Sequence, residues 1–282
     1  MTATSAVILG LVQGIAEFLP ISSSGHLSIL QNLFGMETAE QGHFLFDVLL
    51  HLGTLVSVCL YYRRDIAAMF QVVLGIFSPR RGEAAEGDDA GRLIQTRRLV
   101  VMIIFSTLPL LLVIPVKKHV ERLYSETGFI GLALILTGCM LFISDKMRRG
   151  EKTEKNMTVL DALIVGVCQA VAVIPGLSRS GVTITAGMST GLDREFAVRY
   201  SFLISLPAVL AANLLSLADA FRAKLDPGLI PVYLLGMAVA GLAGYISIGL
   251  VGMITRRGRF GAFAFYCWIV GATTIVLSFM FG

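Results

Sequence analysis

The chain has 282 residues, of which 55% are hydrophobic and only 15% are charged, and its mean hydropathy is +0.78. Because about a quarter of the residues of a soluble globular domain are charged, this composition excludes that class and indicates an integral, all-helical, polytopic membrane protein. The net charge of +4 comes from arginines and lysines in the loops, so it reports topology and predicts no nucleic-acid partner.

Two features of ordinary secreted proteins are not expected. The N-terminus, MTATSAVILG, has no basic start and no small-residue cleavage site, so no signal peptide is predicted. The cysteines lie inside apolar segments without the spacing of metal ligands, so neither a disulfide framework nor a zinc site is expected. They are Cys59, Cys139, Cys168 and Cys267.

The first half of the chain begins with an apolar segment at about 5–35 that is interrupted midway by Pro20 and a Ser-Ser-Ser-Gly run. Polar, irregular backbone at membrane depth survives only where protein or water covers it, so this segment is predicted to be a re-entrant helical hairpin. A short interfacial helix at 66–77 and a solvated loop at 78–98 are also expected. The spanning helices predicted in this half are 44–62, 99–116 and 128–144.

The second half repeats this plan. An apolar segment at 159–190 is interrupted by Pro175, Gly176 and a Ser-Arg-Ser-Gly run, and a second re-entrant hairpin is predicted there. Three more spanning helices follow, which makes about six in total. They are predicted at 201–219, 229–254 and 261–281.

Basic residues are concentrated in three loops. The 63–98 loop has seven arginines, the 145–158 loop has five basic residues, and the 255–259 turn has three arginines. The opposite loops have fewer basic residues, namely Lys117, Lys118, Arg122, Arg222 and Lys224. The positive-inside bias puts the first group in the cytoplasm, so the first hairpin is expected to enter from outside and the second from inside.

The two interrupted segments are related in sequence. Residues 13–27, QGIAEFLPISSSGHL, recur loosely 156 positions later at 169–183, QAVAVIPGLSRSGVT. The pairs that match at this offset are Gly10 and Gly166, Gln13 and Gln169, Ala16 and Ala172, Ser22 and Ser178, Ser24 and Ser180, and Gly25 and Gly181. Related segments that enter from opposite faces form an inverted-topology repeat, although small-residue helix contacts can also look alike by chance.

The domain prediction follows from this repeat. We expect a single integral membrane domain over 1–282, made of two inverted repeats at about 1–145 and 159–282 that are joined by a cytoplasmic loop.

The two copies differ in their polar groups, which predicts one composite site. Glu17 and His26 occur only in the first copy, whereas Arg179 and Thr183 occur only in the second. A carboxylate in a membrane segment is costly, so Glu17 is expected to act as a general base or a metal ligand, the alternative being a buried structural acid. His26 is expected to transfer a proton or to attack phosphorus, the alternative being a structural histidine.

The remaining groups suit a phosphate. Serines at a helix start either cap the helix or, with its free N–H groups, bind an anion, and Ser23 is the candidate nucleophile. Arg179 is the expected phosphate clamp, and an ion pair with Glu17 is the alternative. The predicted catalytic residues are thus Glu17, Ser23, His26 and Arg179. The predicted phosphate-binding residues are Gln13, Ser22, Ser24, Ser178, Ser180 and Thr183.

Other polar residues receive weaker assignments. His51 belongs either to the site or to helix packing. His43 and His119 are expected at the membrane interface, and Asp47 and Asp161 at helix ends or in packing.

The motif QxxxE followed by FLPISSSGH, together with PGLSRSGVT, resembles the undecaprenyl pyrophosphate phosphatase family of bacteria, the bacitracin-resistance type. The resemblance covers nearly the whole chain, including FDVLLHLGTL and SFLISLPAVLAA. It implies that a group of six residues hydrolyses a polyprenyl diphosphate lipid to the monophosphate and inorganic phosphate, which recycles the cell-wall lipid carrier in the bacterial inner membrane. These residues are Glu17, Ser23, His26, Ser178, Arg179 and Thr183.

The resemblance also implies a site that opens toward the periplasm and stimulation by divalent cations, Mg²⁺ or Ca²⁺. Gln13 matches the family pattern but leaves Glu17 as the one carboxylate of the motif. We expect Glu17 to activate the nucleophile and His26 either to protonate the leaving oxygen or to hold Ser23. The nucleophile stays open between Ser23, His26 and water, and the oligomeric state is open too, a homodimer being one option.

Three other functions compete. A transporter or lipid flippase without hydrolysis would have the same broken helices. A lipid phosphatase of the phosphatidic-acid type would need a histidine where Thr185 stands and an Arg-Pro dipeptide that the chain lacks. A non-catalytic scaffold would leave the doubled polar motif unexplained.

Overall fold

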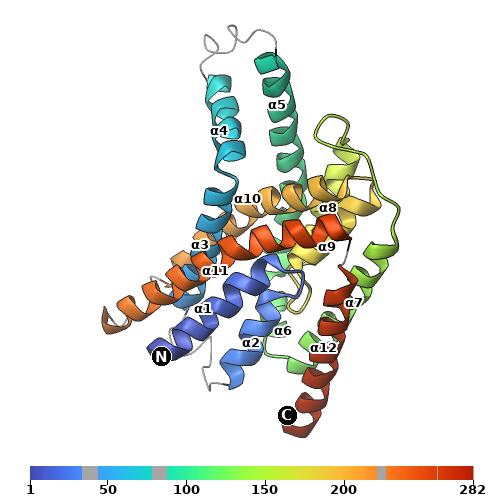
Figure 1. Ribbon diagram of the computed structural model, residues 1–282. Coiled ribbons are helices and arrows are strands. Elements are labelled where there is room, and N and C mark those ends of the chain that lie inside the picture. The colour runs from blue at the N-terminus through green and yellow to red at the C-terminus, as the bar shows by residue number, and fades with distance from the viewer. Residues whose placement is uncertain (34–43, 78–87, 221–226, 259, 282) are drawn as a thin grey trace.

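The computed structural model describes residues 1–33, 44–77, 88–220, 227–258 and 260–281. These residues are almost entirely helical, and no strand longer than an isolated bridge forms among them (Figure 1). His43 lies outside the described residues. The helices are α1 (Ala3–Phe18), α2 (Ser23–Leu33), α3 (Phe44–Tyr61), α4 (Arg63–Phe77), α5 (Asp88–Thr107), η2 (Leu108–Val116), α6 (Lys117–Leu123), α7 (Thr127–Lys146), α8 (Val159–Val171), α9 (Arg179–Ser189), α10 (Arg194–Ala220), η3 (Pro227–Leu229), α11 (Ile230–Arg257) and α12 (Gly261–Phe281).

Length and composition make five of the helical stretches able to cross a membrane. They are Gly91–Leu123, Thr127–Lys146, Arg194–Ser216, Pro227–Arg256 and Gly261–Met280. A sixth span exists if α3 and α4, which meet at an angle of 87°, count together. The outer surface is correspondingly apolar: Leu112 is 73% and Phe279 86% exposed. The expected class, an all-helical multi-pass membrane protein with about six spans, is confirmed.

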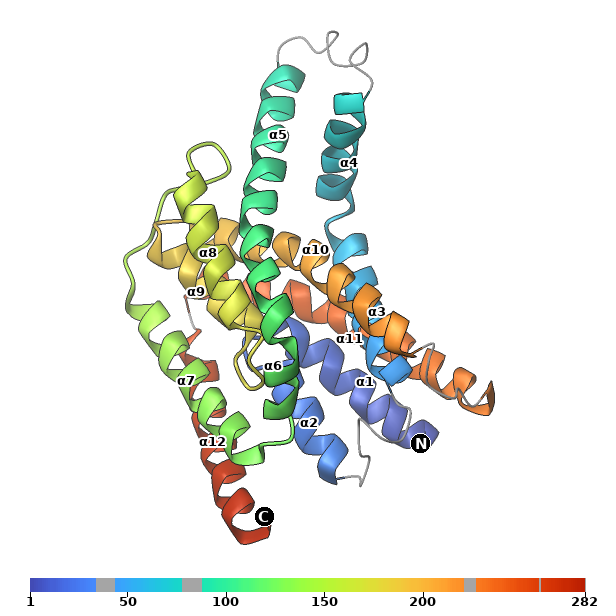
Figure 2. The same ribbon diagram turned by 180° about the vertical axis from the view of Figure 1, so that it is seen from behind.

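The region before the second predicted span was assigned wrongly. The predicted solvated loop at 78–98 ends earlier, because α5 already begins at Asp88. In Figures 1 and 2, α4 and α5 lie side by side and project together from the rest of the molecule. Leu99 of α5 is buried and Arg98 Nη2 donates to the Met157 carbonyl at 2.8 Å, so the charged turns that begin at Asp88 extend a helix that is anchored from Arg98 onward. The short helix predicted at 66–77 is part of α4, and its interfacial position stays a prediction.

The predicted span at 99–116 is not a uniform α-helix. It changes at Leu108 into the 3₁₀-helix η2, with Pro109 in its first turn and Pro115 near its end. Proline lacks the N–H that continues an α-helix, which accounts for the change.

Both interrupted segments fold as two helices joined by a short turn, α1 with α2 and α8 with α9. The helices after the turns begin at Ser23 and Arg179, which keeps the 156-residue offset of the sequence repeat. The preceding helices have 16 and 13 residues, fewer than the roughly 20 needed to span a bilayer. Hairpins therefore form as expected, and their re-entrant, inverted arrangement stays a prediction.

Glycines at equivalent positions of the two repeats let each hairpin pack closely against a neighbouring helix. A side chain at Gly10 would meet the carbonyl oxygen of Gly236 on α11 at 2.6 Å, and one at Gly166 would meet that of Ser106 on α5 at 2.5 Å. Each hairpin can lie this close to its neighbour because its first helix has no Cβ at the contact. Among the remaining helices, α7 packs against α12, and α3 packs against both α10 and α11 (Figure 2). The two interhelical turns are thereby held inside the molecule, where the candidate residues lie.

Candidate active site

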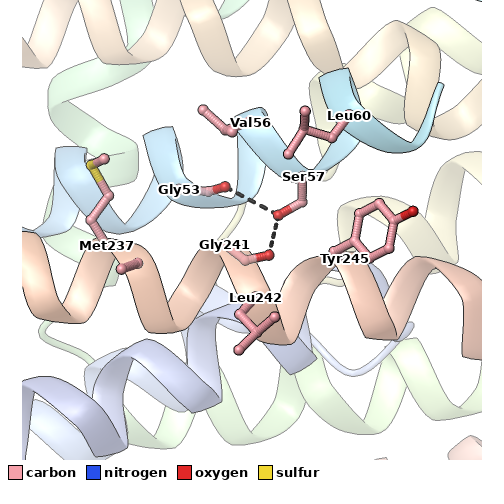
Figure 3. A pocket seen from close by; sticks show the side chains of 9 residues that line it. Gly53, Val56, Ser57, Leu60, Met237, Gly241, Leu242 and Tyr245 are labelled. Carbon is pink, nitrogen blue, oxygen red and sulfur yellow. Dashed lines mark hydrogen bonds between the residues drawn. The ribbon is translucent and has the colours of Figure 1, made fainter. Parts of the chain in front are cut away.

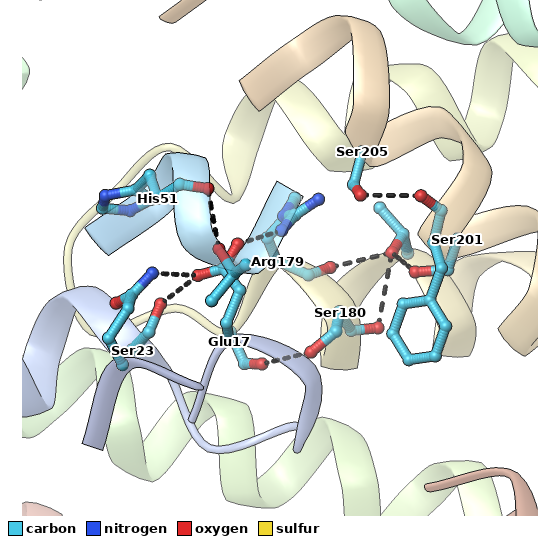
Figure 4. Close-up of polar contacts among 12 residues, drawn as sticks. Glu17, Ser23, His51, Arg179, Ser180, Ser201 and Ser205 are labelled. Carbon is cyan, nitrogen blue, oxygen red and sulfur yellow. Dashed lines mark hydrogen bonds and ion pairs between the residues drawn. The ribbon is translucent and has the colours of Figure 1, made fainter. Parts of the chain in front are cut away.

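Glu17 is the centre of a buried polar cluster that joins the two hairpins. It lies in the last turn of α1 and is 8% exposed. Its Oε2 accepts hydrogen bonds from Ser23 Oγ at 2.6 Å and from Gln13 Nε2 at 3.1 Å. Its Oε1 forms an ion pair with the guanidinium of Arg179 (Figure 4). Residues from both copies of the motif thus meet at one carboxylate, and the ion pair considered for Glu17 and Arg179 is present.

The turn between α1 and α2 brings Ser23 to Glu17. Leu19 leaves α1 in an extended conformation, and Ser22 adopts a left-handed conformation with φ 69°. Such a φ is uncommon for residues other than glycine and is often found at functional turns. Ser22 Oγ accepts from the Gly25 N–H at 3.3 Å and caps α2, so its hydroxyl stabilises the turn while the next residue faces the acid.

The turn between α8 and α9 places Arg179. Gly176 has φ +90°, and a Cβ there would lie 2.5 Å from the carbonyl oxygen of Ile130 on α7, so only glycine fits. Ser178 then caps α9 by accepting from the Gly181 N–H at 3.1 Å. Arg179, the first residue of α9, projects toward Glu17. Its side chain is 20% exposed and that of Glu17 only 7%, so the ion pair is largely shielded from water.

The other hydroxyls of the second motif have partners within the protein. Ser180 Oγ lies 3.2 Å from Ser178 Oγ and 3.4 Å from the Leu19 carbonyl. Thr183 Oγ1 donates to the Arg179 carbonyl at 2.8 Å and lies 2.5 Å from Ser201 Oγ of α10. These contacts hold the second turn against the first turn and against α10. Direct phosphate binding by these hydroxyls stays a prediction.

His26 lies in α2 but does not hold Ser23. Its Nδ1 donates to the Ser22 carbonyl at 2.7 Å, and its Nε2 lies 2.7 Å from the hydroxyl of Tyr266 on α12. The expectation that His26 holds Ser23 is therefore wrong, because Glu17 reaches across the turn and takes the Ser23 hydroxyl itself. The role of His26 in proton transfer stays a prediction.

The structure adds two residues to the surroundings of Glu17. His51 of α3 interacts electrostatically with Glu17 and donates from Nδ1 to the Asp47 carbonyl at 2.8 Å (Figure 4). Of the two alternatives for His51, the site or helix packing, its position near Glu17 favours the site. Tyr124, in the turn before α7, interacts with the Ser24 hydroxyl, and burial raises the pKa of its phenol. A histidine in an apolar segment was a signal for His51, whereas no local motif marks Tyr124.

The acids assigned to packing behave as expected. Asp47 accepts from Gln31 Nε2 at 2.8 Å. Asp161 completes a capping box with Thr158 at the start of α8 and binds Lys152 Nζ at 3.0 Å.

His119 is exposed on α6. All four cysteines are free.

The walls around the cluster combine polar and apolar residues. Glu17 and Arg179 line a narrow cleft that leaves no room for a water molecule. Its other lining residues come mostly from α3 and α10 and are Phe18, Thr54, Leu55, Val58, Ser205 and Val209. A larger cavity of about 430 Å³ between α3 and α11 is lined by residues such as Val56, Leu242 and Tyr245, with no acid, arginine or histidine (Figure 3). The acid and the arginine therefore lie at the narrow cleft and not at the larger cavity.

The cluster does not form a metal site of its own. Among the described residues, no group of three His, Cys, Asp or Glu side chains lies close enough to hold an ion. Glu17 supplies one carboxylate, and both of its oxygens already accept from neighbouring side chains. A protein-held Mg²⁺ or Ca²⁺ usually has more oxygen ligands than this single carboxylate supplies.

The chain is similar to known proteins over nearly its whole length. The family described as bacitracin resistance protein BacA matches residues 6–273. A protein of Methanosphaera stadtmanae is 41% identical, with 97% of each chain covered. One of Carboxydothermus hydrogenoformans is 38% identical, with 99% of this chain and 98% of the relative covered. Both relatives are named undecaprenyl-diphosphatase. The chain belongs to the bacitracin resistance protein BacA family.

Proposed function

We propose that this protein hydrolyses undecaprenyl diphosphate to undecaprenyl phosphate and inorganic phosphate. It thereby recycles the lipid carrier for peptidoglycan synthesis in the bacterial inner membrane and gives resistance to bacitracin. The family and the names of its relatives support this activity. The observation that carries it is the buried contact of Ser23 Oγ with the Glu17 carboxylate at 2.6 Å, beside the guanidinium of Arg179.

Ser23 is the proposed nucleophile and Glu17 its general base. As Ser23 Oγ attacks the terminal phosphorus, its proton passes to Glu17 Oε2, the atom that it already touches. The bond from that phosphorus to the bridging oxygen breaks, and undecaprenyl phosphate leaves with the bond's electron pair. Glu17 passes its proton to the departing phosphate and is ionised again. It then takes a proton from a water molecule as that water attacks the phosphoserine. The bond from phosphorus to Ser23 Oγ breaks, inorganic phosphate leaves, and Glu17 returns the proton to Ser23 Oγ. In the alternative, water attacks directly and no phosphoserine forms.

Arg179 is the proposed phosphate clamp. Its planar guanidinium binds phosphate oxygens in pairs and stabilises the charge that develops on them during transfer. Without substrate it pairs with Glu17. When the guanidinium turns to the incoming phosphate, Glu17 loses its counter-charge and becomes a stronger base. Substrate binding and activation of the base are thus coupled in our proposal.

The residues around the site suggest where the substrate tail and a stimulating cation would bind. Leu55 of α3 and Val209 of α10 give the surroundings of the cluster an apolar side, toward which the first prenyl units of the lipid would lie. A stimulating Mg²⁺ or Ca²⁺ would bind mainly to the diphosphate oxygens, because the protein supplies one carboxylate. Transport without hydrolysis is not favoured, because the relatives are named for a phosphatase activity.

The test is phosphate release from undecaprenyl diphosphate in detergent micelles. We expect release by the wild type and a loss of about 100-fold or more in Ser23→Ala and Arg179→Ala, the size expected for a nucleophile or a charge-stabilising group. Ser189→Ala, an exposed serine at the far end of α9, is the matched control and should keep wild-type activity. A folded wild type that releases no phosphate with or without Mg²⁺ or Ca²⁺ would refute the proposal and favour transport.

A further inference from the structure

Tyr266 of α12 contacts His26 of α2 in two ways. The Tyr266 hydroxyl lies 2.7 Å from His26 Nε2. The two rings stack with centroids 5.6 Å apart and an angle of 9° between their planes. The residues are 240 positions apart in sequence, so the contact connects the first hairpin to the last helix.

The hydrogen bonds define the state of the imidazole. A carbonyl oxygen only accepts, so the 2.7 Å contact with the Ser22 carbonyl requires the proton on Nδ1. In the neutral ring Nε2 then has the lone pair and accepts from the Tyr266 hydroxyl. The Ser22 carbonyl and the Tyr266 hydroxyl together select one tautomer and one ring orientation.

The imidazole that is held in this orientation belongs to a residue near the proposed nucleophile, Ser23. His26 lies three residues after Ser23 in α2, about one turn along the same helix. The first hairpin itself supplies only the Ser22 contact, from the turn before α2. The second hydrogen bond and the stacked ring come from α12, so Tyr266 provides the constraint that α2 lacks.

We propose that Tyr266 is a positioning residue for phosphoryl transfer, which holds the His26 imidazole in one tautomer and orientation beside Ser23. The proposal rests on the proposed function. Tyr266 acts through His26, so its contribution disappears when His26 is replaced.

A double-mutant cycle tests this dependence. Tyr266→Phe removes the hydroxyl and keeps the ring. We expect kcat to fall about five- to tenfold with KM near the wild-type value, the effect of losing one hydrogen bond. In the His26→Ala background the same change should have no further effect. Tyr245→Phe is the matched control, because Tyr245 is 42% exposed and Tyr266 41%, and it should keep wild-type kcat.

A second measurement does not depend on turnover. Nitrogen-15 NMR of the full-length protein should show an Nδ1-protonated His26, and the Nε2 signal should shift in Tyr266→Phe but not in Tyr245→Phe. An unchanged Nε2 signal, an unchanged kcat, or losses that add in the double variant would each overturn the positioning role. These results in an active wild type leave the phosphatase assignment intact, whereas a folded wild type without activity overturns both.

Discussion

Replacing Glu17 by glutamine is the most informative single change, because Glu17 is both the proposed base and the partner of Arg179. Glutamine keeps the shape and can still accept from Ser23 or Gln13. It removes the charge that faces the guanidinium. One substitution therefore tests a chemical role and a structural role, and the two roles have separate readouts.

The structure sets the expected sizes. Removing one partner of a buried ion pair costs about 3–5 kcal/mol of unfolding free energy. The Arg179 side chain keeps 20% of its surface exposed, which lets water solvate part of the stranded charge, so we expect about 3 kcal/mol. Loss of a general base lowers the rate by about 10²- to 10⁴-fold. Phosphate release from undecaprenyl diphosphate and thermal unfolding, both in the same detergent, measure the two effects.

A second variant separates the two effects. In Glu17→Gln with Arg179→Met, neither charge remains, so stability should recover part of the loss while activity stays low. Activity of Glu17→Gln within tenfold of the wild type would refute the role of Glu17 as base. Unchanged unfolding of the single variant would refute the stabilising ion pair.

Three further predictions concern the helix starts and turns that hold the site, each measured by thermal unfolding in detergent. Ser22→Ala removes the cap of α2 and should cost about 1 kcal/mol, and a variant as stable as the wild type would show that the cap is not needed. Gly176→Ala combines φ +90° with a Cβ 2.5 Å from the Ile130 carbonyl and should cost at least about 2 kcal/mol, so a neutral effect would contradict the tight turn. Asp161→Ala removes the capping box of α8 and the contact with Lys152 and should cost about 2 kcal/mol, a value that Lys152→Ala alone should not reach.

Much of the site could be predicted from the repeat. Glu17 and Arg179 were unusual polar residues in apolar segments, and their division between two copies of one motif predicted that they would meet. The use of the neighbouring hydroxyls could not be predicted in the same way. A serine at a helix start can cap, bind an anion or attack, and the difference between Ser22, a cap, and Ser23, which contacts the acid, depends on the backbone angles of the turn.

The sequence by itself determined the membrane class, the two broken segments and the residue types of the composite site. Hydropathy, helix-breaking residues and the cost of buried charge act over short stretches of chain and are readable there. The tertiary structure decided that α5 extends to Asp88 and that Tyr124 and Tyr266 reach the α2 residues Ser24 and His26. Those contacts join positions about 100 and 240 residues apart, and only the packing of whole helices brings them within hydrogen-bonding distance.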